Sequence, residues 1–116
     1  VLHPAGEELP PAALPTSGPR PAIVLIDGTW AQSSAMLRAV QAGARRIRLP
    51  MTGESRYWLR TQVTPGCYST AEALSFLLAH LGLTDAAALL RRQLELLVYA
   101  GLLSRGLKAR AADYLA

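Results

Sequence analysis

The fold is decided by a segment that reads AIVLIDGTW at residues 22–30. Its first five residues, Ala22–Ile26, are apolar and rich in β-branched side chains, which is typical of a strand buried on both faces of a parallel sheet. From Trp30 to about Ala42 the apolar residues recur with helical spacing, and Gly43 is placed to end a helix. The segment therefore predicts a buried strand, a short turn and a helix.

Two later segments continue this alternation. Apolar residues alternate with arginines in Arg45–Leu49, which predicts a second strand that Pro50 closes. Ser69-Thr70-Ala71-Glu72 has the pattern of a capping box, in which the serine oxygen accepts a backbone N–H and the glutamate reaches back. A helix is therefore expected from Ser69 to Gly82.

A long last helix is expected from Thr84 or Asp85, either of which can cap it, to about Leu103. Because strands alternate with helices, the sequence predicts an α/β layered domain with a mainly parallel sheet. The inward side of the last helix is expected to hold Leu89, Leu90, Leu94, Leu97 and Tyr99.

Length and composition indicate one domain. The chain has 116 residues, of which 51% are hydrophobic, so it has enough apolar material for a core. Six of the eight prolines lie between Pro4 and Pro21, and residues 5–21 are therefore expected to form a Pro-rich loop. No apolar run reaches the roughly 20 residues that a membrane span needs. No positively charged leader precedes an apolar run.

The cysteine and histidine content indicates the cellular compartment and whether a metal site is expected. The lone Cys67 has no partner within the chain for a disulfide, and no Cys/His set has metal-ligand spacing. We therefore expect a reducing compartment, the cytoplasm, and no metal within this chain. Cys67 and His80 are both expected to be packing residues rather than reactive groups.

The net charge of +4 is concentrated in one stretch. Between Leu9 and Ala71, seven arginines face only two acids, Asp27 and Glu54, which gives a local net charge of +5. Guanidinium groups bind phosphates through paired hydrogen bonds and stack on bases, so this charge indicates contact with nucleic acid. A high-GC genome that favours arginine codons is the alternative. The seven are Arg20, Arg38, Arg45, Arg46, Arg48, Arg56 and Arg60.

Asp27-Gly28-Thr29-Trp30 lies where the first predicted strand meets its helix. Ligands of open α/β sheets bind beyond the carboxyl ends of strands, close to helix N-termini. There Asp27 offers a carboxylate, Gly28 lets the backbone approach closely, and Thr29 supplies a hydroxyl. Trp30 supplies a flat apolar surface. The alternative is that Asp27 or Thr29 only caps the helix while Trp30 packs in the core.

Two further segments have a pattern suited to ligands. Ser55–Arg60 interleaves arginines with aromatic residues, which suits an RNA strand because phosphates meet arginine and unstacked bases meet rings. Its alternative is a solvated loop in which Tyr57 or Trp58 plugs the core. Pro65–Ala73 is a glycine-bearing turn before a capped helix, whose N-terminus can receive a carboxylate, and its alternative is a cap alone.

Taken in order, these segments resemble the DTW-domain family of tRNA-uridine aminocarboxypropyltransferases. The resemblance covers roughly Val1 to Leu78, and its specificity lies in the order and spacing of several short phrases. They are Leu2-His3-Pro4, Ile26-Asp27-Gly28-Thr29-Trp30, Arg48-Leu49-Pro50, Ser55-Arg56-Tyr57 with Leu59-Arg60, Gly66-Cys67, and Ser69-Thr70-Ala71-Glu72-Ala73.

The resemblance implies a SPOUT-like fold with a carboxy-terminal trefoil knot. It also implies transfer of the 3-amino-3-carboxypropyl group of S-adenosylmethionine, the co-substrate, to N3 of a uridine in tRNA, the partner. The family's amino-terminal portion, with its cysteine cluster, has no counterpart here. We therefore interpret residues 1–116 as the carboxy-terminal core of a DTW domain whose amino-terminal part is missing.

The resemblance and the residue types together suggest a role for each candidate. Asp27 is the expected catalytic residue, because a carboxylate can accept the uracil N3 proton or align donor and acceptor. The expected cofactor-binding residues are Gly28, Thr29, Trp30, Leu49, Pro50, Tyr68, Ser69 and Thr70. The expected RNA-binding residues are Arg45, Arg46, Arg56, Tyr57 and Arg60.

Two other functions fit the same sequence. The first is an aminocarboxypropyltransferase that acts on ribosomal RNA, because nothing in the sequence names the RNA. The second is a non-catalytic RNA-binding module that keeps the basic face. It predicts an RNA affinity that falls steeply with salt and no binding of S-adenosylmethionine.

Overall fold

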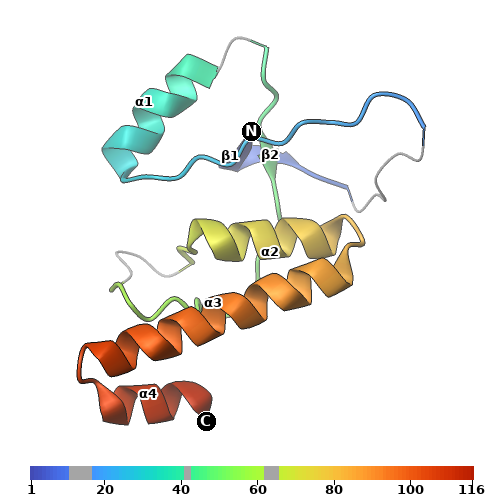
Figure 1. Cartoon of the computed structure of the whole chain (residues 1–116). Helices are drawn as coiled ribbons and strands as arrows, with labels where there is room; N and C mark the ends of the chain where they lie inside the picture. The colour runs from blue at the N-terminus through green and yellow to red at the C-terminus, as the bar shows by residue number, and fades with distance from the viewer. Residues whose placement is uncertain (11–16, 41–42, 62–65) are drawn as a thin grey trace.

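The computed structural model describes residues 1–10, 17–40, 43–61 and 66–116 (Figure 1). Within these residues there are a small sheet and four helices, which confirms the α/β class. Figure 1 shows α2 between the sheet and α3, with α4 beyond α3 at the C-terminus. In chain order the elements are β1 (Leu2–Glu8), α1 (Trp30–Val40), β2 (Ile47–Arg48), α2 (Thr70–His80), α3 (Thr84–Ser104) and α4 (Lys108–Leu115).

The sheet in the described residues consists of β1 and β2, which pair in parallel. β2 confirms the centre of the strand predicted at Arg45–Leu49. Both Leu2 and Glu7 pair with Ile47, so β1 bulges between them. Gly6 lies in this bulge, where an added Cβ would lie 2.6 Å from the carbonyl carbon of Ile47. β1 was not predicted, and residues 5–8 of the predicted Pro-rich loop lie within it.

The buried strand predicted at Ala22–Ile26 is wrong in the structure. These residues form no regular strand, and each is exposed or half-buried. The Leu2 amide does donate to the Val24 carbonyl at 3.1 Å, so the segment runs beside β1. A central parallel strand needs bonded neighbours on both sides and helices over both faces, and the described sheet supplies neither.

The four helices match the sequence pattern unevenly. α1 begins at Trp30 as expected and continues to Val40, and the predicted end at Ala42 lies outside the described residues. α2 has the expected capping box at Ser69. α3 spans the expected length, but Leu83 occupies the N-cap without a side-chain hydrogen bond, so capping by Thr84 or Asp85 is wrong.

The inward face predicted for α3 is only partly correct. Leu94 is buried, and Leu90 and Tyr99 are half-buried, whereas Leu89 and Leu97 are 61% and 60% exposed. The buried positions follow one narrow stripe: Ala87, Leu94, Val98 and Leu102. Leu89 and Leu97 lie off this stripe because each residue advances about 100° around a helix.

The core forms where α3 meets α4. Its buried members are Leu94, Val98, Leu102, Ala111 and Tyr114, with Tyr57, Trp58, Leu59, Ala71 and Tyr99 packed around them. Trp58 and Tyr57 therefore plug the core, as the alternative interpretation of Ser55–Arg60 expected. Among the described residues, no helix combines the length and apolar character that crossing a membrane requires.

Candidate active site at the amino-terminal end of α2

The site begins with a contact between two segments that lie 43 residues apart in the sequence. The Thr70 hydroxyl, in the first turn of α2, donates to a carboxylate oxygen of Asp27 at 2.6 Å. Asp27 is exposed, so its carboxylate lies at the surface beside the start of α2. The structure thus brings together the Asp27–Trp30 and Ser69–Ala73 segments that the sequence suggested separately.

The start of α2 is held by its capping box. Ser69 Oγ accepts from the Glu72 amide at 3.3 Å, while the Glu72 carboxylate accepts from the Ser69 amide at 2.8 Å. Both groups satisfy backbone donors that a helix start leaves open. The position of Thr70, and with it the contact to Asp27, depends on this cap.

Glu72 also joins α2 to the loop before it. Its side chain is 8% exposed and accepts from Ser55 Oγ at 2.9 Å and from the Arg56 amide at 2.6 Å. A buried carboxylate is stable only when hydrogen bonds replace its water, and these donors do so. One side chain therefore fixes the Ser55–Arg56 turn against the amino-terminal end of α2.

Replacing the capping serine tests how firmly this end is held. We expect Ser69→Ala to lower the free energy of unfolding by about 1 kcal/mol, because the Glu72 amide loses its acceptor. Urea unfolding followed by circular dichroism measures the change. Ser104→Ala is the control, since Ser104 is exposed at the end of α3 and bonds only its own helix. Equal, negligible effects of both variants would contradict a role for the cap.

Tyr68 connects the same end of α2 to the loop at Gly53. Its hydroxyl donates to the Gly53 carbonyl, and its ring packs edge-on against Phe76 with centroids 5.4 Å apart. Tyr68 and Phe76 together present aromatic surface beside the helix start.

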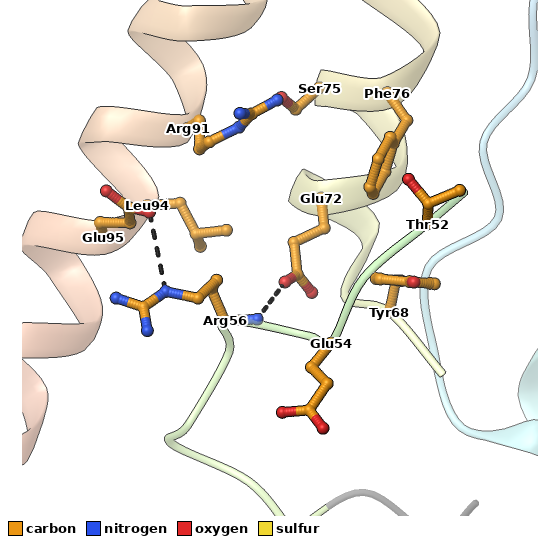
Figure 2. Close-up of a pocket in the computed structure, with 10 residues that line it drawn as sticks. All are labelled: Thr52, Glu54, Arg56, Tyr68, Glu72, Ser75, Phe76, Arg91, Leu94 and Glu95. Carbon is orange, nitrogen blue, oxygen red and sulfur yellow. Dashed lines mark hydrogen bonds and ion pairs between the residues drawn. The ribbon is translucent and has the colours of Figure 1, made fainter. Parts of the chain in front are cut away.

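A pocket of about 370 Å³ lies between α2, α3 and the 52–56 loop (Figure 2). Its lining includes apolar and aromatic side chains together with five charged side chains. The lining residues are Thr52, Glu54, Arg56, Tyr68, Glu72, Ser75, Phe76, Arg91, Leu94 and Glu95.

Arg56 is held tightly by its neighbours. Its Nη2 donates to the Tyr114 carbonyl at 2.6 Å, and its Nε lies 3.7 Å from a carboxylate oxygen of Glu95. The guanidinium carbon lies 3.9 Å from the centre of the Tyr114 ring, within cation–π range. The guanidinium is therefore fixed at the edge of the pocket.

The other residues of the Asp27–Trp30 segment organise the start of α1. The Thr29 amide donates to Gln32 Oε1 at 2.9 Å, and Thr29 Oγ1 accepts from the Gln32 amide at 3.3 Å, so Thr29 caps α1. At Gly28 a Cβ would lie 3.0 Å from Gln32 Oε1, so a side chain there would crowd the cap. Trp30 is the first residue of α1.

The remaining candidates lie around the sheet. Leu49 is buried directly after β2, and Pro50 is exposed beside it. Arg45 forms a 2.9 Å ion pair with Glu7 of β1, and both side chains are 71% exposed. Arg46 is half-buried and its carbonyl accepts from the Glu7 amide, whereas Arg60 is exposed.

Several residues of the site were not found by the sequence analysis. Glu72 had been expected only to cap α2, yet it also binds the Ser55–Arg56 turn. Arg91 and Glu95 lie on α3, which contains none of the short motifs that resemble the family. Their spacing of four residues, which places them on one face of a helix, was the only indication in the sequence.

His80, which was expected to be a packing residue, is half-buried, and its Nε2 lies 2.6 Å from the Leu9 carbonyl. No group of His, Cys, Asp or Glu in the described residues could hold a metal ion.

Comparison with protein families identifies what these segments share. A family model described as the DTW domain matches residues 3–101. The chain belongs to the DTW-domain family. The match includes both segments that meet at Asp27 and Thr70 and ends within α3, so α4 lies beyond it.

A curated protein with a related sequence is a tRNA-modifying enzyme by name. The tRNA-uridine aminocarboxypropyltransferase 2 of Drosophila melanogaster is 37% identical to this DTW-domain chain over 81 residues. These residues make up 68% of the chain and 32% of the relative, so the chain spans about a third of that protein's length. No solved structure matches the chain.

Proposed function

We propose that this DTW-domain chain takes part in transferring the 3-amino-3-carboxypropyl group of S-adenosylmethionine to N3 of a uridine in tRNA. The 2.6 Å contact between Asp27 and Thr70 is the observation that supports it most directly. It brings a carboxylate to the start of a helix, where ligands of α/β proteins commonly bind. The relative named as a tRNA-uridine aminocarboxypropyltransferase supports the reaction class.

The residues present fit S-adenosylmethionine in size and chemistry. The pocket of about 370 Å³ opens beside Tyr68 and offers aromatic surface together with both signs of charge. When bound, S-adenosylmethionine would supply a carbon made electrophilic by the adjacent sulfonium, and the bond from this carbon to sulfur would break as the bond to N3 forms, with methylthioadenosine as the leaving group. Of the residues assigned to the cofactor, Tyr68 lines this pocket. In this proposal the backbone at Leu49–Pro50, Ser69–Thr70 and Gly28–Trp30 holds the part of the cofactor that lies outside the pocket.

Asp27 has the chemical role in this proposal. Uracil N3 is a poor nucleophile while it keeps its proton, so a carboxylate near N3 speeds the reaction by accepting that proton. The Thr70 hydroxyl binds one carboxylate oxygen and so orients the group. Asp27 is exposed, which leaves it accessible to an RNA substrate.

RNA binding is assigned to the arginine-rich surface. Arg45 and Arg60 are exposed, and Arg46, Arg56 and Tyr57 are half-buried. Arg60 is the most accessible of these to phosphates, because Arg56 and Tyr57 are engaged with the core. Arg45 would reach a phosphate by exchanging its exposed ion pair with Glu7. We also propose that the catalytic unit has a SPOUT-like fold with a carboxy-terminal trefoil knot. We further propose that the protein acts in the cytoplasm.

Calorimetry with S-adenosylmethionine tests the proposal. We expect a measurable heat of binding for the 116-residue chain, and also for a longer chain that contains it. An absence of binding in both would contradict the proposal. RNA affinity that falls steeply with salt, without any binding of S-adenosylmethionine, would instead favour a non-catalytic RNA-binding module.

A further inference from the structure

Most polar groups in the pocket between α2 and α3 are already engaged. The Glu72 carboxylate is saturated by donors from the Ser55–Arg56 turn and from Ser69. The Ser75 hydroxyl donates to the Ala87 carbonyl at 3.1 Å, and Arg56 binds the Tyr114 carbonyl. These groups shape the pocket but have little capacity left for a ligand.

Arg91 differs from them. Its side chain lines the pocket, and it makes no hydrogen bond or ion pair with any residue that the structure describes. In Figure 2 its guanidinium extends from α3 toward Ser75, across the upper part of the pocket. Five N–H donors in a planar fork suit a carboxylate particularly well.

Glu95 lies one helical turn further along α3, on the same face as Arg91. Side chains four residues apart on a helix have Cβ atoms about 5–6 Å apart, close enough to pair. Yet no ion pair joins Arg91 and Glu95 in the structure, and Glu95 instead makes a long 3.7 Å contact with Arg56. Arginine before glutamate is the weaker order for such a pair, which is consistent with Arg91 being unpaired among the described residues while Glu95 makes only the long contact with Arg56.

The rest of the pocket is suited to a short aliphatic chain. Phe76 and Leu94 provide apolar wall, and Tyr68 lies two residues before Thr70, the residue that binds Asp27. Of the five charged side chains that line the pocket, Arg91 and Glu95 are the two that lie on α3, and the apolar wall lies beside them near the amino-terminal end of α2.

We propose that this pocket binds the α-amino acid end of S-adenosylmethionine. Arg91 binds the α-carboxylate, Glu95 binds the α-ammonium, and Phe76 and Leu94 contact the methylenes between them and the sulfonium. This inference rests on the proposed function and adds to it the residues that hold the transferred group. It assigns a binding role to α3, a helix that contains none of the short motifs that resemble the family.

A comparison of two ligands on three proteins tests the role of Arg91. S-adenosylmethionine and its decarboxylated analogue share the sulfonium and the amine and differ in the carboxylate. We expect the unmodified chain to bind S-adenosylmethionine about tenfold more tightly than the analogue, the size expected for a charge-assisted contact in a partly solvated pocket. Arg91→Gln should reduce this ratio to near one, as measured by calorimetry.

Arg92→Gln is the matched control. Arg92 is the adjacent residue, has the same charge and does not line the pocket, so its loss should leave the tenfold ratio unchanged. A ratio that persists in Arg91→Gln, or that falls equally in both variants, would overturn the proposal while the proposed function stands. Failure of both the 116-residue chain and a longer chain that contains it to bind either ligand would overturn the proposed function itself, and this inference with it.

Glu95→Gln examines the other end of the ligand. Both ligands keep the amine, so this change should weaken both by about fivefold and leave their ratio near ten. Unchanged affinities in this variant would overturn the assignment of Glu95. Thermal unfolding of each variant, followed by circular dichroism, shows whether the fold is retained.

Discussion

Asp27→Asn should lower the rate of uridine modification by at least about 100-fold, the scale on which a general base contributes. The substitution keeps the shape of the side chain and removes its charge and its ability to take a proton. The amide oxygen of asparagine can still accept from the Thr70 hydroxyl, so the contact to α2 should persist. A large kinetic loss without a structural change would therefore report on chemistry.

The measurement needs a preparation of the protein that modifies tRNA, assayed by mass spectrometry of the product nucleoside. Thr70→Val provides a graded comparison, because it removes the hydroxyl that orients Asp27 and leaves the carboxylate. We expect its loss to be smaller than that of Asp27→Asn. Near-normal turnover by Asp27→Asn, with unchanged binding of S-adenosylmethionine, would remove Asp27 from the mechanism and leave the cofactor site intact.

Local signals in the sequence were sufficient for the starts of α1 and α2, whereas α4 was not predicted and the cap predicted for α3 was wrong. Ser69 and Glu72 specify the start of α2 through groups three residues apart, and the structure contains both hydrogen bonds. Thr29 and Gln32 have the same spacing and cap α1 in the same way, although the sequence analysis offered Thr29 only as one of two possible caps. Such features are predictable because all interacting groups lie within one turn of chain.

The errors fall where the outcome depends on distant partners. Ala22–Ile26 has the composition of a buried strand, yet it lacks a second neighbour to pair with in the described sheet. β1 contains Pro4 and two glutamates, which argue against a strand locally, and it forms because β2 accepts it as a parallel partner. Strand formation depends on context more than helix formation does.

In the candidate site, too, local features were predictable and long-range contacts were not. The sequence found Asp27 and Thr70 as separate candidates, but only the structure shows their contact across 43 residues. The long reach of Glu72 to Ser55 and Arg56 has no sequence signal beyond the residue types. Arg91 could not be found from the sequence, because it stands out by having no partner among the residues that the structure describes, which no local pattern records.

Tyr114→Ala should be the most damaging single change to stability, with a loss of about 3–5 kcal/mol, as for other buried aromatic side chains. Tyr114 is 1% exposed and lies in α4, beyond the matched DTW domain. Its ring packs edge-on against Trp58 with centroids 5.0 Å apart and lies under the Arg56 guanidinium. Because small domains are stable by only about 5–15 kcal/mol, this loss is a large fraction of the total.

Tyr114→Phe is the informative control because the Tyr114 hydroxyl is buried without a hydrogen-bond partner among the described residues. Removing an unsatisfied polar atom relieves its desolvation cost, so the phenylalanine variant should be at least as stable as the unmodified chain. The backbone carbonyl that binds Arg56 is unchanged in both variants. Urea unfolding of the three proteins should give this order of stability, with phenylalanine highest or equal and alanine far lowest.

The pH dependence of the same proteins gives an independent check. Burial raises the pKa of Tyr114 above its ordinary value of 10.0, although the Arg56 charge opposes the shift. The unfolded chain therefore ionises first, so the contribution of Tyr114 to stability is complete below pH 10 and is lost as the pH rises through the higher pKa of the folded state. Tyr114→Phe should lose less stability than the unmodified chain above pH 10. If the two proteins instead lose stability equally there, the buried hydroxyl is not the group that titrates, and Tyr114 stabilises the α3–α4 core through its ring alone.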